Sequence, residues 1–191
     1  MYHITSRANH KDRYLESAIA KDLFIEQLAR MREKHDCEII DFMVMNNHIH
    51  LVLQPLKDSN LSACMQWLLG VYSMNYNRVF TTWGSVWGSR YFSRPIIGLG
   101  DLIHTIEYID ANPVRACLID RSESWKWGGL YYHRNCRDDI IGPPPPWLTL
   151  VAPTHRRISL GSDPHLLGSD PSDHSPLDTV PPQMLLFRYY E

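Results

Sequence analysis

The spacing of apolar residues along the chain alternates between the two-residue period of a strand and the longer period of a helix. Tyr2–Arg7 reads as a short strand, and apolar residues recur with helical spacing over Ala18–Lys34. Glu38–Met45 is rich in strand-forming residues and ends at Asn46-Asn47, a turn signal. His48–Gln54 is a second apolar strand, so the two strands predict a hairpin.

A second helix is predicted after the hairpin. Asn60 can cap it, and apolar residues follow with helical spacing as far as Val79. The segment from Gly84 to Gly88 ends this helix, and Tyr91–Ile97 predicts a fourth strand.

A last helix is predicted to begin at Asp101 and to continue to Asn112. Pro113 either interrupts it or occupies the first position of a new short helix. The order β-α-β-β-α-β followed by a helix predicts an α+β fold of the ferredoxin-like, split β-α-β type. We therefore expect an antiparallel sheet with helices on one face, plus a C-terminal helix that carries Tyr108.

The composition changes near residue 138, which predicts two parts. Residues 1–137 hold the predicted elements, and 138–191 form an acidic tail rich in Pro, Ser and Asp that we expect to be disordered or extended. No apolar run approaches the roughly 20 residues of a membrane span, and no signal peptide is visible. The four cysteines form no C-x-x-C pair, which argues against a disulfide framework and is typical of a cytoplasmic protein.

The net charge of −2 argues mildly against nucleic-acid binding, but the charge is unevenly distributed. No acidic residue lies between Asp58 and Asp101, a stretch that contains Arg78, Arg90 and Arg94 among many aromatic residues. Phosphates attract cations and unpaired bases stack on flat rings, so this composition suits single-stranded nucleic acid. For any one of these aromatic residues, a position in the hydrophobic core is an equally good interpretation.

Two histidines are the first candidates for chemistry. His48 and His50 are separated by one residue on a predicted strand, so both side chains leave the same face, about 6.6 Å apart. That spacing allows both imidazoles to bind one cation. An H-x-H pair also arises often by chance. Spacing alone therefore does not decide between a metal site and two ordinary histidines.

The last predicted helix carries the second candidate pair. Tyr108 and Asn112 are four residues apart and share a helical face, so a hydroxyl group and an amide oxygen would project together. Without further information, a tyrosine on a helix is more often a core or surface residue than a nucleophile.

These segments resemble a known family. Asn47-His-Ile-His-Leu-Val52 is similar to the His-hydrophobic-His (HUH) motif of single-tyrosine transposases, and the segment from Tyr108 to Ile119 resembles their tyrosine helix. Agreement extends to Tyr2–Asn9, Trp87–Phe92 and Trp125-Lys-Trp127. The resemblance covers roughly residues 1–135 and is strongest to the REP-associated tyrosine transposases of the IS200-like superfamily. Ala8 and Cys117 stand where that family is expected to have glycine, and the tail has no counterpart in it.

The resemblance implies a mechanism. His48, His50 and Asn112 would hold Mg²⁺ or Mn²⁺, and the Tyr108 hydroxyl would attack a DNA phosphate to give a 5′-phosphotyrosine and a free 3′-OH. For Asn112 the alternative is that it caps a following helix. The implied partner is single-stranded or hairpin DNA, bound by a monomer or a homodimer.

Five arginines are candidates for DNA contacts, with solvated surface positions as the alternative: Arg7, Arg78, Arg90, Arg94 and Arg115. Two further readings of the chain stay open. One is a hairpin-binding protein that has lost efficient cleavage, and the other is an HUH initiator of replication or conjugation, which is usually larger.

Overall fold

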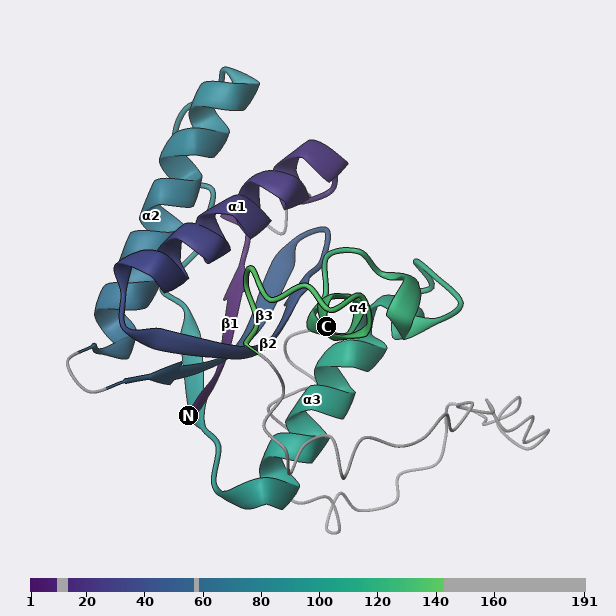
Figure 1. The fold of residues 1–191 in the computed structure, drawn as a ribbon. Helices are drawn as coiled ribbons and strands as arrows, with labels where there is room; N and C mark the ends of the chain where they lie inside the picture. Colours follow the sequence, from purple (N-terminus) through teal and green to yellow (C-terminus); the bar gives the residue numbers. More distant parts are fainter. Residues whose placement is uncertain (10–13, 57–58, 143–191) are drawn as a thin grey trace, which may run out of the picture. The chain divides into compact units, whose positions relative to one another are not determined.

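A computed structural model describes residues 1–9, 14–56 and 59–142 of the chain (Figure 1). Four strands form one antiparallel sheet in the order β2-β3-β1-β4. The strands are β1 (Tyr2–Arg7), β2 (Cys37–Val44), β3 (His48–Pro55) and β4 (Phe92–Pro95). This order, with a helix after β1 and another after β3, is the predicted ferredoxin-like arrangement, which is thereby confirmed.

Two long helices cover one face of the sheet. They are α1 (Ala18–Lys34) and α2 (Leu61–Phe80), and each begins where a side chain caps its first turn. Ser17 accepts a hydrogen bond from the Ala20 amide, and Asn60 accepts one from the Ala63 amide. Their apolar residues pack against alternate strand residues, and this main core includes Ile4, Phe24, Leu28, Ile49, Leu51, Met65, Leu68 and Tyr72, all fully buried.

The opposite face of the sheet is covered by α3 (Gly98–Arg115). Leu102 and Ile109 of this helix form a second cluster with Met43 and Val52 of the sheet and with Trp125. Strand alternation separates the two clusters, because Leu51 points to α1 and α2 whereas its neighbour Val52 points to α3. A short 3-10 helix (Ser122–Ser124) and α4 (Gly129–Arg134) follow.

The strand pairing contains one irregularity. Ile39 pairs with Leu53 and Asp41 pairs with Val52, so Ile40 is an extra residue on β2. His133 of α4 donates a hydrogen bond to the Ile40 carbonyl, with Nε2 and O 3.3 Å apart. The bulge therefore leaves a carbonyl that a side chain from another element satisfies.

The element boundaries depart from expectation in three places. β4 covers only Phe92–Pro95 instead of Tyr91–Ile97, because Gly98, with a φ of +83°, turns the chain directly into α3. The tyrosine helix begins at Gly98 instead of Asp101 and continues through Pro113 to Arg115. The short helix α4 was not predicted.

Ile140 and Ile141 are buried in the main core. The predicted boundary at 137/138 and the predicted disorder of the tail stay predictions, and residues 143–191 lie outside the described part. No helix in the described ranges is long and apolar enough to span a membrane.

Candidate active site

β3 presents His48 and His50 on the face of the sheet that α3 covers. Their ring centroids are 5.0 Å apart and the ring planes are nearly perpendicular. Across the sheet on β1, Arg7 is paired with His48 and Thr5 with His50. The structure thus brings the two predicted ligands together at the edge of a polar patch on an otherwise apolar sheet.

Each of the two imidazoles has its Nδ1 atom engaged in a hydrogen bond. His48 Nδ1 donates to the side-chain oxygen of Asn47, 2.7 Å away. His50 Nδ1 lies 3.1 Å from His3 Nε2 and 3.3 Å from the Thr5 hydroxyl. The atom left on each ring is Nε2, and that of His50 is buried with no hydrogen-bond partner among the described residues.

Burial keeps these imidazoles neutral. It lowers the pKa of His48 to about 4, with a further contribution from the nearby Arg7 guanidinium. The pKa of His50 lies well below its usual value for the same main reason, and the neighbouring His48 and His3 add to the effect. Neutral imidazole is the form that binds metal ions, so the site is ready for a cation at neutral pH.

Helix α3 brings Tyr108 to the histidines. Leu102 and Ile109 anchor the helix in the second cluster, and the Tyr108 ring comes to lie edge-on to His50, with centroids 5.7 Å apart. The ring also lies 6.4 Å from His3, and the Arg115 guanidinium carbon is 5.5 Å from its centroid. The predicted nucleophile and the two predicted histidine ligands, which are far apart in the chain, therefore meet in one place.

Asn112 and Pro113 form one unit in this helix. Pro113 has no N–H, so the Ile109 carbonyl lacks its normal backbone donor. The Asn112 side-chain nitrogen donates to this carbonyl at 3.3 Å and to the Tyr108 carbonyl at 2.9 Å. Asn112 lies inside one continuous helix, so the alternative of a cap for a following helix is wrong. With Nδ2 engaged on the helix, Oδ1 is the atom available to a ligand.

The residues fit a divalent cation. The buried Nε2 of His50 has no hydrogen-bond partner within the described ranges, the Nε2 of His48 is its counterpart, and the Asn112 oxygen would be a third donor. Nowhere in the described part do three His, Cys, Asp or Glu side chains group around a possible metal position.

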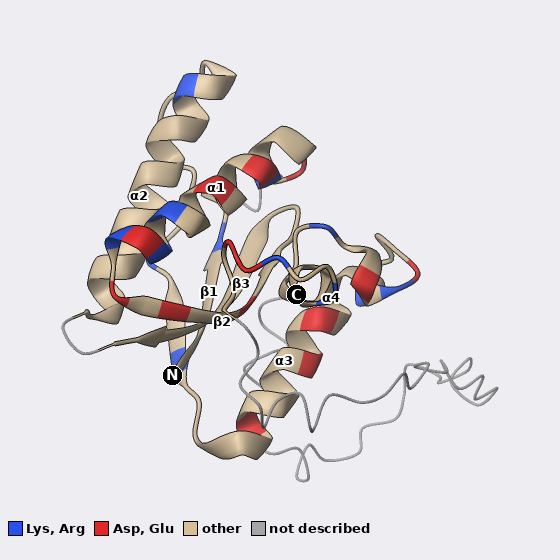
Figure 2. Cartoon of the chain, viewed as in Figure 1, with Lys and Arg blue, Asp and Glu red and all other residues tan. Residues whose placement is uncertain are grey.

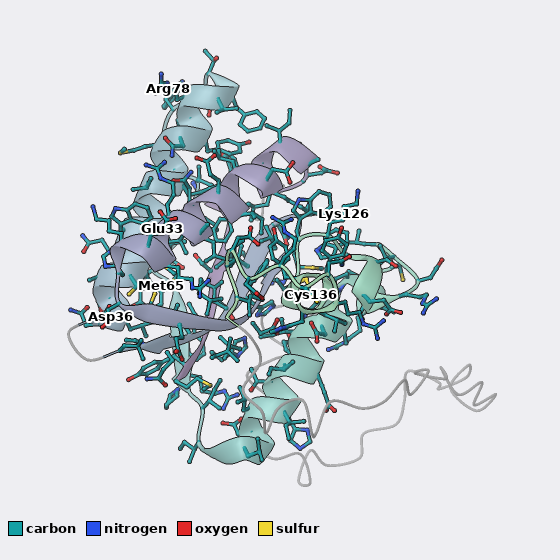
Figure 3. The ribbon with its side chains drawn as sticks, viewed as in Figure 1. Glu33, Asp36, Met65, Arg78, Lys126 and Cys136 are labelled. Carbon is teal, nitrogen blue, oxygen red and sulfur yellow. The ribbon has the colours of Figure 1, made fainter. Side chains whose placement is uncertain are left out.

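The five predicted DNA-contacting arginines do not lie together. Arg7 and Arg115 flank the histidines and Tyr108, as described above. Arg94 donates to both carboxylate oxygens of Asp101, at 2.9 and 2.8 Å, and to the Thr105 hydroxyl, so it joins β4 to α3. Arg90 is exposed in the loop before β4, and Arg78 lies at the far end of α2, on the other side of the sheet (Figure 3).

The structure separates the aromatic residues of the acid-free stretch. Tyr72, Tyr76 and Trp87 are buried in the main core, whereas Trp83 is 93% exposed. Asn77 fixes the loop that carries Trp83, because its side chain donates to the Gly84 carbonyl and accepts from the Thr82 hydroxyl, both at 2.9 Å. Figure 2 shows that α2 is almost free of charge up to its last turn, where Arg78 lies.

Sequence reasoning missed three buried polar groups near the site. His3 touches His50, and the alternation His3-x-Thr5-x-Arg7 on β1 is the signal that could have found it. Lys21 of α1 is 2% exposed and donates to Asn46, the residue before Asn47. No sequence pattern signals this lysine.

The third missed group is a pair of carboxyl groups, Asp41 on β2 and Asp110 on α3. Asp41 is 2% exposed, and Oδ1 of Asp110 has no hydrogen-bond partner in the described residues. Burial raises the pKa of Asp110 to about 7. Burial also raises the pKa of Asp41, and the neighbouring Asp110 adds to the rise. The helix with the tyrosine therefore meets the sheet at two carboxyl groups that favour their protonated forms.

One further histidine and one cavity lie outside this group of residues. His104 of α3 is exposed, and its Nδ1 lies 3.6 Å from a carboxylate oxygen of Glu107. A cavity of about 420 Å³ near the start of α3 is lined by Met1, Ile96, Gly98, Leu99 and Leu102. None of the predicted site residues lines it.

Comparison with known proteins gives a family and a similar fold. The family model described as "Transposase IS200 like" matches residues 1–112. A search of curated proteins finds no match. Among solved structures, one described as a REP-associated tyrosine transposase bound to a REP hairpin is 15% identical, with a TM-score of 0.60 over 70% of this chain and 78% of that one.

A second solved structure, a putative transposase from Deinococcus radiodurans, is 17% identical, with a TM-score of 0.45 over 57% of this chain and 87% of that one. The first likeness supports the fold, and the family match covers the sheet, the histidines, Tyr108 and Asn112. The chain belongs to the family of IS200-like transposases.

Proposed function

We propose that this transposase-family protein nicks and rejoins single-stranded DNA through a covalent bond to Tyr108, with a divalent cation at His48, His50 and Asn112. One observation carries the proposal. The Tyr108 ring, from a helix, lies 5.7 Å from the ring of His50, from a strand, and the Nε2 of His50 is buried without a partner among the described residues. Since an unpartnered buried nitrogen is unfavourable in a stable fold, this arrangement supports a ligand-binding role.

Tyr108 is the nucleophile in this mechanism. Its hydroxyl oxygen forms a bond to phosphorus while the bond from phosphorus to the 3′ oxygen breaks. The 5′ end of the DNA becomes attached to the tyrosine, and the 3′ oxygen leaves as a hydroxyl, so the proton lost by the phenol is balanced by the proton that the 3′ oxygen gains. Attack of a 3′-OH on the phosphotyrosine reverses the step and joins strands.

The chain's own groups prepare this step. His48 and His50 stay neutral because they are buried, and their Nδ1 contacts hold the rings with Nε2 available. The Arg115 guanidinium, beside the Tyr108 ring, would attract an approaching phosphate. When bound, Mg²⁺ or Mn²⁺ would polarise the phosphate and neutralise the charge that develops on it.

Folded single-stranded DNA is the proposed substrate. The related solved structure is described as bound to a REP hairpin. Here, Trp83 offers an exposed ring on a loop held by hydrogen bonds, and no acidic residue lies between Asp58 and Asp101. An unpaired base can stack on such a ring, and its phosphates avoid nearby negative charge.

The test is covalent capture of labelled hairpin DNA. The full chain is incubated with 5′- or 3′-labelled single-stranded hairpins and Mn²⁺, and denaturing gels show whether label migrates with the protein. We expect an adduct with the wild type that retains the DNA downstream of the nick, and none with Tyr108→Phe. Adduct formation by Tyr108→Phe would refute the assignment of the nucleophile.

A binding protein without cleavage would give a different result. The wild type would retain the hairpin in native gels but give no adduct at any Mn²⁺ concentration. His48→Ala separates the two cases further, because it should abolish cleavage while leaving hairpin retention nearly unchanged.

A further inference from the structure

His3 lies directly behind the predicted ligand His50. Its Nε2 is 3.1 Å from His50 Nδ1, and the two rings are stacked at 23° with centroids 5.3 Å apart. His3 is 3% exposed and lies on β1, the strand that pairs directly with β3. Its position is therefore fixed by the sheet itself.

The chemistry of a metal-binding imidazole sets the direction of this hydrogen bond. A histidine that binds a cation through Nε2 must carry its proton on Nδ1, where that proton needs an acceptor. For His48 the acceptor is the Asn47 side-chain oxygen, 2.7 Å away, which can only accept. Among the described residues, the hydrogen-bonding neighbours of His50 Nδ1 are His3 Nε2 and the Thr5 hydroxyl at 3.3 Å, and neither is a carboxylate or an amide.

We infer that His3 is a positioning residue for the metal site, accepting the Nδ1 proton of His50 at its own Nε2 and thereby directing His50 Nε2 toward the cation. This inference rests on the proposed function. It predicts a chain of two neutral imidazoles, in which His3 carries its proton on Nδ1 and His50 also carries its proton on Nδ1. Free neutral imidazole side chains prefer the opposite form, with the proton on Nε2, so the form required at His50 needs a fixed acceptor.

The unpartnered Nε2 of His50 supports this direction. If His3 donated to His50 Nδ1, the proton of His50 would be on Nε2, where the described residues offer no acceptor. A buried N–H without a partner is unfavourable by about 1–3 kcal/mol. If His50 donates to His3, the buried Nε2 holds only a lone pair, which is the group that a cation would use.

The experiment compares three variants of the full chain in their affinity for Mn²⁺ alone, measured by calorimetry or by the loss of the free-ion electron paramagnetic resonance signal. His3→Leu removes the acceptor and should weaken Mn²⁺ binding by about 10- to 100-fold. His3→Gln keeps an acceptor oxygen at similar reach and should restore most of the affinity. His104→Leu, at an exposed position of α3, is the matched control and should bind as the wild type does.

A spectroscopic measurement separates positioning from packing. Long-range ¹H–¹⁵N spectra of the metal-free wild type should show His50 protonated on Nδ1, and His3→Leu should move the proton to Nε2 in part or in full. Wild-type His50 protonated on Nε2, or undiminished Mn²⁺ binding by a folded His3→Leu, would overturn the inference. If Thr5→Val weakens binding and His3→Leu does not, Thr5 is the acceptor and the inference is also wrong.

Failure of the proposed function would look different. If the wild type binds Mn²⁺ with the expected dependence on His3 but forms no DNA adduct, the proposed nicking activity is refuted and the role of His3 is retained. If the wild type binds no Mn²⁺, both the proposed metal site and the role of His3 are refuted.

Discussion

Lys21 connects three segments around the site, and its replacement by methionine tests how much this connection contributes. The ammonium group donates to the Glu16 carbonyl at 2.7 Å and to the Asn46 side-chain oxygen at 2.9 Å. It also lies 5.4 Å from the Trp125 ring and 4.9 Å from the Trp127 ring. α1, the turn before His48 and the segment after α3 therefore share one buried cation.

The magnitude follows from these contacts. Lys21→Met leaves two acceptors without their donor. Each buried acceptor that loses its donor lowers the stability by about 1–3 kcal/mol. It also removes two cation–π contacts, each worth about 0.5–2 kcal/mol. Methionine recovers part of this loss, because it fills a similar volume and needs no desolvation of a charge. We expect a net loss of about 2–4 kcal/mol from a total stability of about 5–15 kcal/mol.

Urea unfolding of the full chain, followed by tryptophan fluorescence, measures this loss. Lys34→Met is the matched control, since Lys34 is on the same helix, is exposed, and makes one cation–π contact, with Trp67 at 5.5 Å. The control should lose less than about 1 kcal/mol. The reasoning is refuted if the two variants lose the same amount. Lys21→Met should also raise the Mn²⁺ concentration needed for half-maximal adduct formation, because Asn46 precedes the residue that holds His48.

Three further predictions concern the site and its surroundings. Pro113→Ala restores a backbone donor to the Ile109 carbonyl and frees the Asn112 amide, so Mn²⁺ affinity should fall while the melting temperature does not; equal Mn²⁺ affinity in calorimetry would contradict this role. The raised pKa values of the two buried carboxyl groups mean that this pair contributes stability below about pH 4 that is lost as pH rises to about 7, whereas the lowered pKa values of the buried His48 and His50 act in the opposite direction; Asp110→Asn should therefore make urea stability rise more steeply with pH over this range than it does in the wild type. If Asp110→Asn leaves the dependence of the unfolding free energy on pH unchanged, Asp110 is not the group that binds the proton on folding. Trp83→Ala should weaken hairpin binding by about 1–3 kcal/mol in a fluorescence anisotropy titration. Met74→Ala, which changes an exposed side chain of α2, is the neutral control.

Local sequence patterns predicted most of the fold. The spans of β1 and α1 agree with their predictions to the residue, because caps and apolar periodicity act within a few positions of the chain. The end of the tyrosine helix was misjudged, because proline was read as a boundary. The Asn112 side chain supplies the donor that proline removes, and that compensation depends on a particular rotamer.

The candidate site was predictable where spacing alone decides geometry. Strand alternation puts His48 and His50 on one face, and helical spacing puts Tyr108 near Asn112. Contacts between distant segments, such as His3 with His50 or Asp41 with Asp110, depend on which strand lies beside which and on how the helix is rotated. No local pattern in the chain specifies either.

The extra residue in β2 determines where the protein could lose one residue without turning the strand over. The pairs Ile39–Leu53 and Phe42–Leu51 both face the main core, one on each side of the bulge. Deletion of Ile40 would therefore restore a regular alternation through Asp41 and keep the other β2 side chains on their present faces. A one-residue deletion in the regularly paired stretch that follows would instead move the residues on one side of it to the opposite face, so we expect a single deletion to be tolerated at the bulge and not beyond it.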